Sequence, residues 1–224
     1  MPPKYTRAMK DIAIYGAGGF GREVACLIRI INESLPEPKW SLVGFFDDGV
    51  EKGATVSHFG VCLGGMETLN QWQTPIDVCI AIGSGRTVEK IVGKIVNPLV
   101  DFPNVIHPDF HCSDPKGFKI GKGNIITGGC CATTDVTVGS FNALNGSVVI
   151  AHDDVIGDYN CFMPGTRISG EVKIGNRNFF GVYSVVLQCL TVKNDTTLAA
   201  GSVLMTKPKE GCTYIGVPAK KMNF

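Results

Sequence analysis

Residues 144–179 read LNGSVV IAHDDV IGDYNC FMPGTR ISGEVK IGNRNF, and an apolar side chain opens every group of six. The register holds without a slip over fifteen positions, from Ile120 to Leu204. Four residues after each of these positions the side chain is mostly small or short, and an apolar–glycine pair returns every eighteen residues from Ile120-Gly121 to Ile174-Gly175. This pattern predicts a parallel β-solenoid of triangular coils, with the large apolar side chain inward and glycine at a corner where the chain turns sharply.

Three short strands would form one coil of eighteen residues, so fifteen groups of six make five coils. Neighbouring coils then supply each other's backbone hydrogen bonds. An ordinary sandwich of alternating strands would not keep a period of six over fifteen repeats. The unbroken register also predicts that no long external loop interrupts residues 120–204.

A second pattern precedes the solenoid. Residues 11–15 (DIAIY) are typical of a buried strand, the turn 16–21 (GAGGFG) follows, and an amphipathic helix runs to about residue 32. Further strands are expected at 41–46 and 77–82, with a helix at about 87–96. This alternation predicts an α/β, Rossmann-like unit with a parallel sheet. We therefore expect a nucleotide-binding domain over residues 1–103, the β-helix over 104–206 and a C-terminal tail over 207–224.

The glycine turn has three interpretations. In this strand–turn–helix context, GxGxxG is typical of a turn that binds the phosphates of NAD or of a nucleotide sugar. The turn could also serve only to pack the helix on the strand. Asp47-Asp48 ends the second strand, where an acidic pair could meet ribose or base. Only about 100 residues precede the solenoid, which leaves no separate catalytic domain for hydride transfer and favours the nucleotide sugar.

Composition excludes several classes of function. With 21 basic and 20 acidic side chains the net charge is +1, and no block of like charge suggests nucleic acid or a membrane surface. No apolar run is long enough to span a membrane, and no apolar segment follows the first ten residues to form a signal peptide. Nine cysteines without CxxC or metal spacing are typical of a reducing cytoplasm.

The four histidines differ in setting. His58 is expected in a loop, while His107 and His111 lack a third metal ligand nearby and are separated by Pro108, so no metal is expected. His152 lies inside the solenoid near a corner and is followed by Asp153. A histidine there is a candidate general base, and an ordinary surface histidine is the alternative.

Taken together, the hexapeptide pattern, the GAGGFG unit and the closing segment 214–220 (YIGVPAK) resemble one family. It comprises bacterial sugar acyltransferases of the left-handed β-helix class, including sialic acid O-acetyltransferases and N-acetyltransferases that act on UDP-linked 4-amino sugars (bacillosamine-type). The resemblance covers about residues 10–222. It implies a homotrimer with acetyl-CoA bound between neighbouring prisms, a nucleotide sugar held by the N-terminal unit, and a role in surface polysaccharide or glycan biosynthesis.

The resemblance also implies particular site residues. His152 corresponds to the catalytic histidine, Asp153 to its supporting acid, Asn145 to an asparagine one wall earlier, and Gly170 to a backbone amide near the thioester. Further acetyl-CoA positions correspond to Cys161, Val182 and Ala200. Nucleotide-sugar positions correspond to Gly18, Gly19, Phe20, Asp47, Asp48, Gly83 and Ser84. Several N-acetylating relatives have histidine where this chain has Phe20 and Cys161.

These residues imply direct transfer of acetyl from acetyl-CoA to the amine of a nucleotide-linked 4-amino-4,6-dideoxy sugar. His152 would take the proton, Asp153 would fix its tautomer, and the Gly170 amide would bind the oxyanion. One group near pH 6.5, or somewhat above, should then control the rate. No cysteine has a base beside it in sequence.

Three alternatives remain. One is O-acetylation of sialic acid or a related sugar, and another is a sugar-binding solenoid without chemistry. The third is a γ-type carbonic anhydrase, which would need three zinc histidines across a subunit interface, whereas only His152 lies in the prism.

Overall fold

The computed structural model describes residues 9–222, which form two compact units. The first unit contains the chain up to Ala81 and the segment Ile95–Pro103, and the second contains Ile82–Lys94 and the chain from Asn104 onward. The outermost parts of the expected domains, residues 1–8 and 223–224, lie outside the described residues. No helix in the described range is long and apolar enough to span a membrane.

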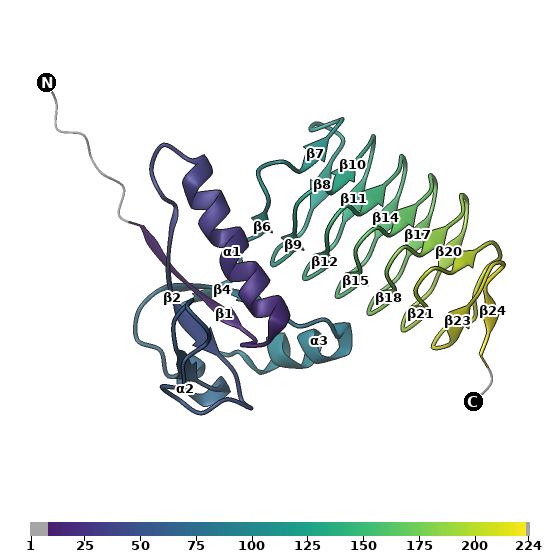
Figure 1. Ribbon diagram of the computed structural model, residues 1–224. Helices are drawn as coiled ribbons and strands as arrows, with labels where there is room; N and C mark the ends of the chain where they lie inside the picture. Colours follow the sequence, from purple (N-terminus) through teal and green to yellow (C-terminus); the bar gives the residue numbers. More distant parts are fainter. Residues whose placement is uncertain (1–8, 223–224) are drawn as a thin grey trace, which may run out of the picture. The chain divides into compact units, whose positions relative to one another are not determined.

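The first unit is built on a five-stranded parallel sheet in the order β3-β2-β1-β4-β5 (Figure 1). Its elements are β1 (Lys10–Tyr15), α1 (Gly19–Ser34), β2 (Trp40–Phe46), β3 (Cys62–Gly64), α2 (Met66–Asn70), β4 (Ile76–Ile80) and β5 (Val100–Asp101). The central strands β1 and β4 are almost wholly buried, as apolar runs in a parallel sheet should be. Strand order reverses between β1 and β4, the place where sheets of this kind bind ligands.

The glycine turn between β1 and α1 follows from close packing. A Cβ on Gly21 would lie 1.9 Å from the carbonyl oxygen of Gly16, so only glycine lets α1 start against the end of β1. Gly16 has φ 113°, a conformation that side chains disfavour. Gly18 and Gly19 have no such contact, so the outer side of the turn is open.

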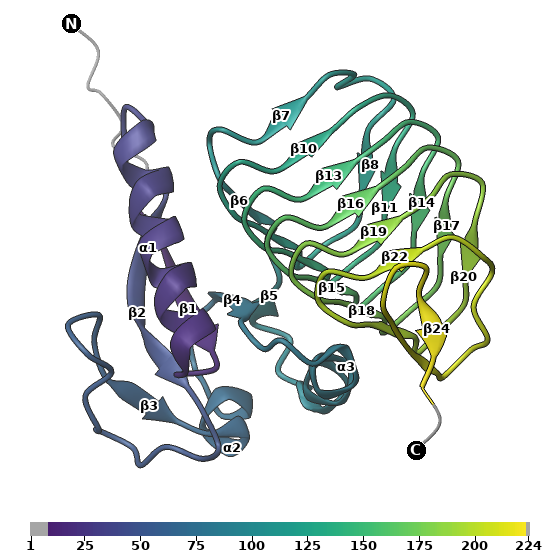
Figure 2. The same cartoon turned by 45° about the vertical axis from the view of Figure 1, so that its right-hand side comes forward.

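The second unit contains α3 (Gly85–Lys94) and a β-solenoid whose strands form three walls (Figure 2). The first wall holds β6 (Val105–Ile106), β9 (Ile125–Ile126), β12 (Ala143–Leu144), β15 (Cys161–Phe162), β18 (Phe179–Phe180), β21 (Thr197–Leu198), β23 (Thr213–Ile215) and β24 (Lys220–Lys221). The second wall holds β7 (His111–Cys112), β10 (Cys131–Ala132), β13 (Val149–Ile150), β16 (Arg167–Ile168), β19 (Val185–Val186) and β22 (Val203–Leu204). The third wall holds β8 (Lys119–Ile120), β11 (Thr137–Val138), β14 (Val155–Ile156), β17 (Lys173–Ile174) and β20 (Thr191–Val192).

The predicted period of six is confirmed by the core. The residue that opens each group is buried from Ile126 to Leu204, while Ile120 at the start is half-buried. Equivalent side chains stack from coil to coil, as in Phe162 and Phe180, whose rings are parallel within 3° at 4.8 Å. The solenoid also starts earlier than the repeat, because β6 and β7 already pair with its first full coil.

The reason expected for the recurring glycines is wrong. The left-handed residue of each turn lies three positions after the apolar opener and is usually not glycine, as in Phe141 and Tyr159, with φ 57° and 60°. Gly139 and Gly157 instead lie where coils approach closely. A Cβ on Gly139 would be 2.6 Å from the carbonyl oxygen of Gly157.

We name the turns by the walls they join. The first corner joins the first wall to the second, the second corner joins the second to the third, and the third corner leads back to the first. A buried ladder of asparagines (Asn124, Asn142, Asn160, Asn178) lines the third corner. Asn142 Oδ1 accepts the backbone N–H of Asn160 at 2.8 Å and its side-chain N–H at 3.0 Å. These short amides therefore fasten successive coils together.

Candidate active site

His152 and Asp153 lie together on the second corner, in the turn between β13 and β14. Asp153 takes the left-handed conformation of that turn, with φ 61°. The His152 Nδ1–H donates to Asp153 Oδ2 at 2.9 Å, and both side chains are 58% exposed. This bond raises the pKa of His152 above its usual value, more than the opposing effect of desolvation. With Nδ1 engaged, Nε2 is the ring atom that can accept a proton.

The imidazole of His152 packs against Gly170 on the next coil. A Cβ at position 170 would lie 2.5 Å from both Cε1 and Nε2 of His152, so the ring occupies space that only glycine leaves open. Gly170 accepts a hydrogen bond from the Cys189 N–H through its carbonyl. Its own N–H has no hydrogen-bond partner among residues 9–222. A free amide thus lies beside the candidate base, although its oxyanion role stays a prediction.

Asn145, Val182 and Ala200 lie on the first corner. Asn145 is half-buried, and its N–H donates to the Phe162 carbonyl. Val182 and Ala200 lie in later turns, eighteen residues apart and one place further into the turn than Asn145, and both are exposed. The second wall runs between this corner and His152, so a single chain does not bring the two sets together.

Cys161 lies on β15 in the first wall and is 3% exposed. Its Sγ is 3.9 Å from the Met163 sulfur. Burial raises the pKa of the thiol to about 12, so it is not a nucleophile near neutral pH. Its expected contact with acetyl-CoA stays a prediction.

The candidate nucleotide-sugar residues of the first unit gather at the carboxyl ends of β1 and β2. Gly18 and Gly19 are exposed, and Phe20 is half-buried in the first turn of α1. Asp47 Oδ2 accepts the Ala17 N–H at 2.8 Å, so this carboxylate braces the glycine turn. The Asp48 carboxylate accepts the Tyr15 O–H at 2.6 Å. Both acids therefore have structural partners, which sequence reasoning did not foresee, and their contact with a nucleotide stays a prediction.

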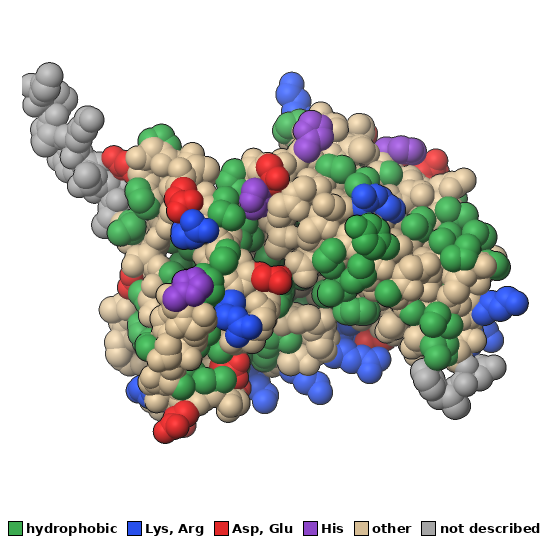
Figure 3. Space-filling model, viewed as in Figure 1, with side chains coloured by type: hydrophobic (Ala, Val, Ile, Leu, Met, Phe, Trp, Pro, Cys, Tyr) green, Lys and Arg blue, Asp and Glu red, His purple; other side chains and the backbone are tan. Residues whose placement is uncertain are grey.

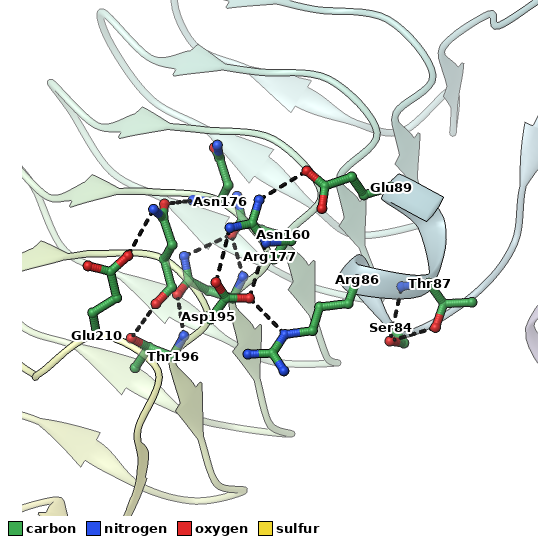
Figure 4. A network of polar contacts seen from close by, with 12 residues as sticks. Ser84, Arg86, Thr87, Glu89, Asn160, Asn176, Arg177, Asp195, Thr196 and Glu210 are labelled. Carbon is green, nitrogen blue, oxygen red and sulfur yellow. Dashed lines mark hydrogen bonds and ion pairs between the residues drawn. The ribbon is translucent and has the colours of Figure 1, made fainter. Parts of the chain in front are cut away.

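Gly83 and Ser84 are exposed and lead into α3 in the second unit. Ser84 Oγ accepts the Thr87 Oγ–H at 3.0 Å. An ion-pair network fixes α3 to the third corner of the solenoid (Figure 4). Asp195 accepts from Arg86 at 2.8 Å and from Arg177 at 3.0 Å, and Arg177 also donates to Glu89 at 3.0 Å. A cavity of about 480 Å³ lies beside this network and is lined in part by Ser84, Arg177 and Asp195.

The other histidines have small local partners. His107 pairs with Asp109, and His111 lies 3.2 Å from Ser113 Oγ. Within the described range no group of three or more His, Cys, Asp and Glu side chains could hold a metal ion.

Asp154 was not among the predicted site residues, and it is fully buried in the same turn as His152. The repeat held a signal for it. Asp154 stands four residues after Ile150, a position that is Val136 and Val172 in the flanking coils. A carboxyl group in this column breaks the apolar pattern.

Comparison with known proteins identifies the class. Residues 11–95 match the PglD N-terminal domain family. PerB from Caulobacter crescentus, in complex with CoA and GDP-perosamine, is 25% identical over 96% of this chain and 99% of its own, with a TM-score of 0.83. The acetyltransferase domain of PglB from Neisseria gonorrhoeae FA1090, in complex with acetyl coenzyme A, is 26% identical over 96% and 100%, with a TM-score of 0.85. WeeI from Acinetobacter baumannii AYE is 26% identical over 96% and 100%, with a TM-score of 0.79.

These similarities extend over both units and confirm the expected fold class, a Rossmann-like unit followed by a left-handed parallel β-helix. They also confirm the resemblance inferred from the repeat and the glycine turn. The chain is an acyltransferase with a left-handed parallel β-helix, and its residues 11–95 match the PglD N-terminal domain family.

Proposed function

We propose that the protein transfers an acetyl group from acetyl-CoA to the amine of a nucleotide-linked 4-amino-4,6-dideoxy sugar, with His152 as general base. The observation that carries the proposal is the geometry of the second corner. Asp153 accepts the hydrogen bond of His152 Nδ1, and the ring lies in the space that a side chain at Gly170 would occupy. PerB, whose structure contains CoA and GDP-perosamine, and the PglB domain, whose structure contains acetyl coenzyme A, support the two substrates.

The mechanism is direct transfer. Nε2 of His152 takes a proton from the attacking amine while the carbon–nitrogen bond forms at the thioester carbonyl. The ionised Asp153 stabilises the resulting imidazolium, and the Gly170 N–H donates to the oxyanion. The imidazolium then returns the proton to the departing CoA sulfur. The buried thiol of Cys161 takes no part, because its pKa is far above neutral.

The proposal includes a homotrimer. His152 and Asn145 lie on different corners of one chain, so a site that uses both needs the second corner of one copy against the first corner of another. Large apolar side chains stay exposed at the first corner, where Val182 is 37% and Tyr183 69% exposed. Figure 3 shows apolar side chains gathered on one face of the solenoid. A neighbouring copy would cover such a surface.

We also propose that the first unit binds the nucleotide part of the sugar substrate rather than NAD. A Cβ on Gly18 or Gly19 would meet nothing within 4 Å, so this turn leaves room for a diphosphate at the start of α1. All nine cysteines are free thiols, which suits work in a reducing cytoplasm.

The test is a panel of UDP-, GDP- and other nucleotide-linked amino sugars with acetyl-CoA, in which the released CoA thiol is measured. We expect turnover with at least one nucleotide-linked 4-amino sugar and none with the same sugar blocked at the amine. Sialic acid serves as the hydroxyl acceptor, and turnover with it alone would replace N-acetylation by O-acetylation. Tight calorimetric binding of NAD, without binding of any nucleotide sugar, would overturn the assignment of the first unit.

A further inference from the structure

Asp154 places a carboxyl group in the core column of the solenoid. It is fully buried at a position that Val136 and Val172 occupy, equally buried, in the flanking coils. Its Oδ1 accepts the Val172 N–H at 2.8 Å, which links it to the next coil. Its Oδ2 is buried and has no hydrogen-bond partner among the described residues. Valine would fill this place without the unsatisfied Oδ2, although the Val172 N–H would lose its acceptor.

A buried acceptor without a partner is unfavourable, and native proteins keep such groups mainly where they serve a function. Asp154 ends the same four-residue turn that carries His152 and Asp153. Glu171 on the following coil also acts on the His152 ring, and Asp135 stands at the corresponding place on the preceding coil. Among these acids, Asp154 is the one held out of water, so its charge is screened least.

We propose that Asp154 is a positioning residue for the general base, whose buried negative charge stabilises the imidazolium that forms on His152 during acyl transfer. The role rests on the proposed function, because it acts through His152. No bond to Asp154 forms or breaks. The carboxylate acts only through its charge, from the side of the turn that faces the core.

The charge of Asp154 changes near neutral pH. Burial raises the pKa of its carboxyl to about 7, against the opposing effects of the Val172 and Ala151 backbone groups and of His152. Asp154 and His152 therefore titrate as a coupled pair, in which a proton on one group makes a proton on the other less favourable. The acid limb of the pH–rate profile should extend over two ionisations, not the single one that the sequence predicted.

The experiment compares wild type with Asp154→Asn and Asp154→Val. Asparagine keeps an acceptor for the Val172 N–H, and valine reproduces the flanking coils, so both variants should fold. The His152 pKa is measured by NMR of the imidazole, with His152→Ala to assign the signal. We expect the pKa of His152 to fall in both variants, because the negative charge of Asp154 is one of the charges that raise it. At pH 8 kcat should fall about tenfold with the KM for acetyl-CoA unchanged, and the acid limb should narrow to one ionisation.

The matched control is Asp158→Asn. Asp158 accepts the Ser140 N–H at 2.6 Å, a similar bond between coils, but on the third corner away from His152. The Asp158→Asn variant should leave the pKa of His152 and the acid limb of the pH–rate profile unchanged. If the pKa of His152 and the acid limb stay at wild-type values in both folded Asp154 variants, Asp154 is only structural. If His152→Ala stays active, the proposed function fails, yet the NMR titration still decides whether the two groups are coupled.

Discussion

The imidazole of His152 occupies the space that a side chain at position 170 would need. A Cβ there would lie 2.5 Å from Cε1 and Nε2 of the ring, well inside van der Waals contact. The two residues stand at the same place on successive coils, with Thr134 before them and Gln188 after them. The glycine is thus explained by its neighbour on the previous coil, not by its own backbone conformation.

Gly170→Ala should displace the ring and lower kcat by about 10²-fold, because a small shift of a general base removes most of its effect. The coil should still form, since Gly170 does not need a left-handed φ. Steady-state kinetics and a thermal melt check this. The control is Gly93→Ala, where a Cβ meets nothing within 4 Å and the rate should not change. A Gly170→Ala enzyme at full rate would show that His152 works in another orientation.

His152→Ala should reduce kcat by about 10²–10⁴-fold with acetyl-CoA affinity nearly unchanged. Asp153→Asn should cost less, because a base remains. Since the hydrogen bond to Asp153 raises the pKa of His152, the ring stays protonated to a higher pH than a free histidine. Removing the charge should lower that pKa and move the acid limb of the pH–rate profile to lower pH. An acid limb that moves to higher pH would contradict the stabilisation of the His152 imidazolium by Asp153.

Asp154 should make folding stability depend on pH. Its folded-state pKa, about 7, lies above the ordinary carboxyl value, so its contribution is fully present below about pH 4 and is lost as pH rises through about 7. Asp154→Val removes the buried carboxyl and should raise the free energy of unfolding by about 1–3 kcal/mol at pH 8. The gain should shrink toward pH 4. Denaturant unfolding at pH 4 and pH 8 measures this gain. An equal gain at both pH values would contradict the ionisation of Asp154.

The asparagine ladder should contribute strongly to stability. Asn160→Ala leaves the Asn178 N–H and the Gly175 carbonyl without their buried partners, at a cost of about 2–4 kcal/mol. Asn176→Ala is the comparison, because Asn176 accepts the Asp158 N–H at 2.8 Å in a more exposed ladder. Its loss should cost about 1 kcal/mol. If urea unfolding gives the same loss of stability for both variants, burial of the asparagine does not determine the size of the loss.

The sequence predicts the solenoid well because one side chain in six must be apolar for coils to stack. It does not predict the turn geometry, since left-handed residues such as Phe141 and Arg177 belong to types that rarely adopt positive φ. The short elements β3, α2 and β5 were missed, because they are too short to show a period. The His152–Asp153 contact follows from adjacency, whereas the Asp47 and Asp48 bonds depend on tertiary contacts that no local pattern encodes.

The last prediction tests whether the site is shared between copies. Asn145→Ala and His152→Ala should each be nearly inactive alone, because each removes one corner of every site. In every trimer that contains both variants, one of the three sites, about one third, combines an intact second corner with an intact first corner from a neighbour. Co-expression with two different tags and purification through both should therefore restore measurable activity.

The control for this experiment mixes His152→Ala with Asp153→Ala. Both residues lie on the second corner of the same chain, so no site in a mixed trimer contains both intact groups. This mixture should stay as inactive as its parts, because a neighbour cannot replace either group. If the Asn145→Ala and His152→Ala mixture shows no gain over the separate variants, the two corners do not meet in one site. A stable monomer in sedimentation at micromolar concentration would exclude the shared site directly.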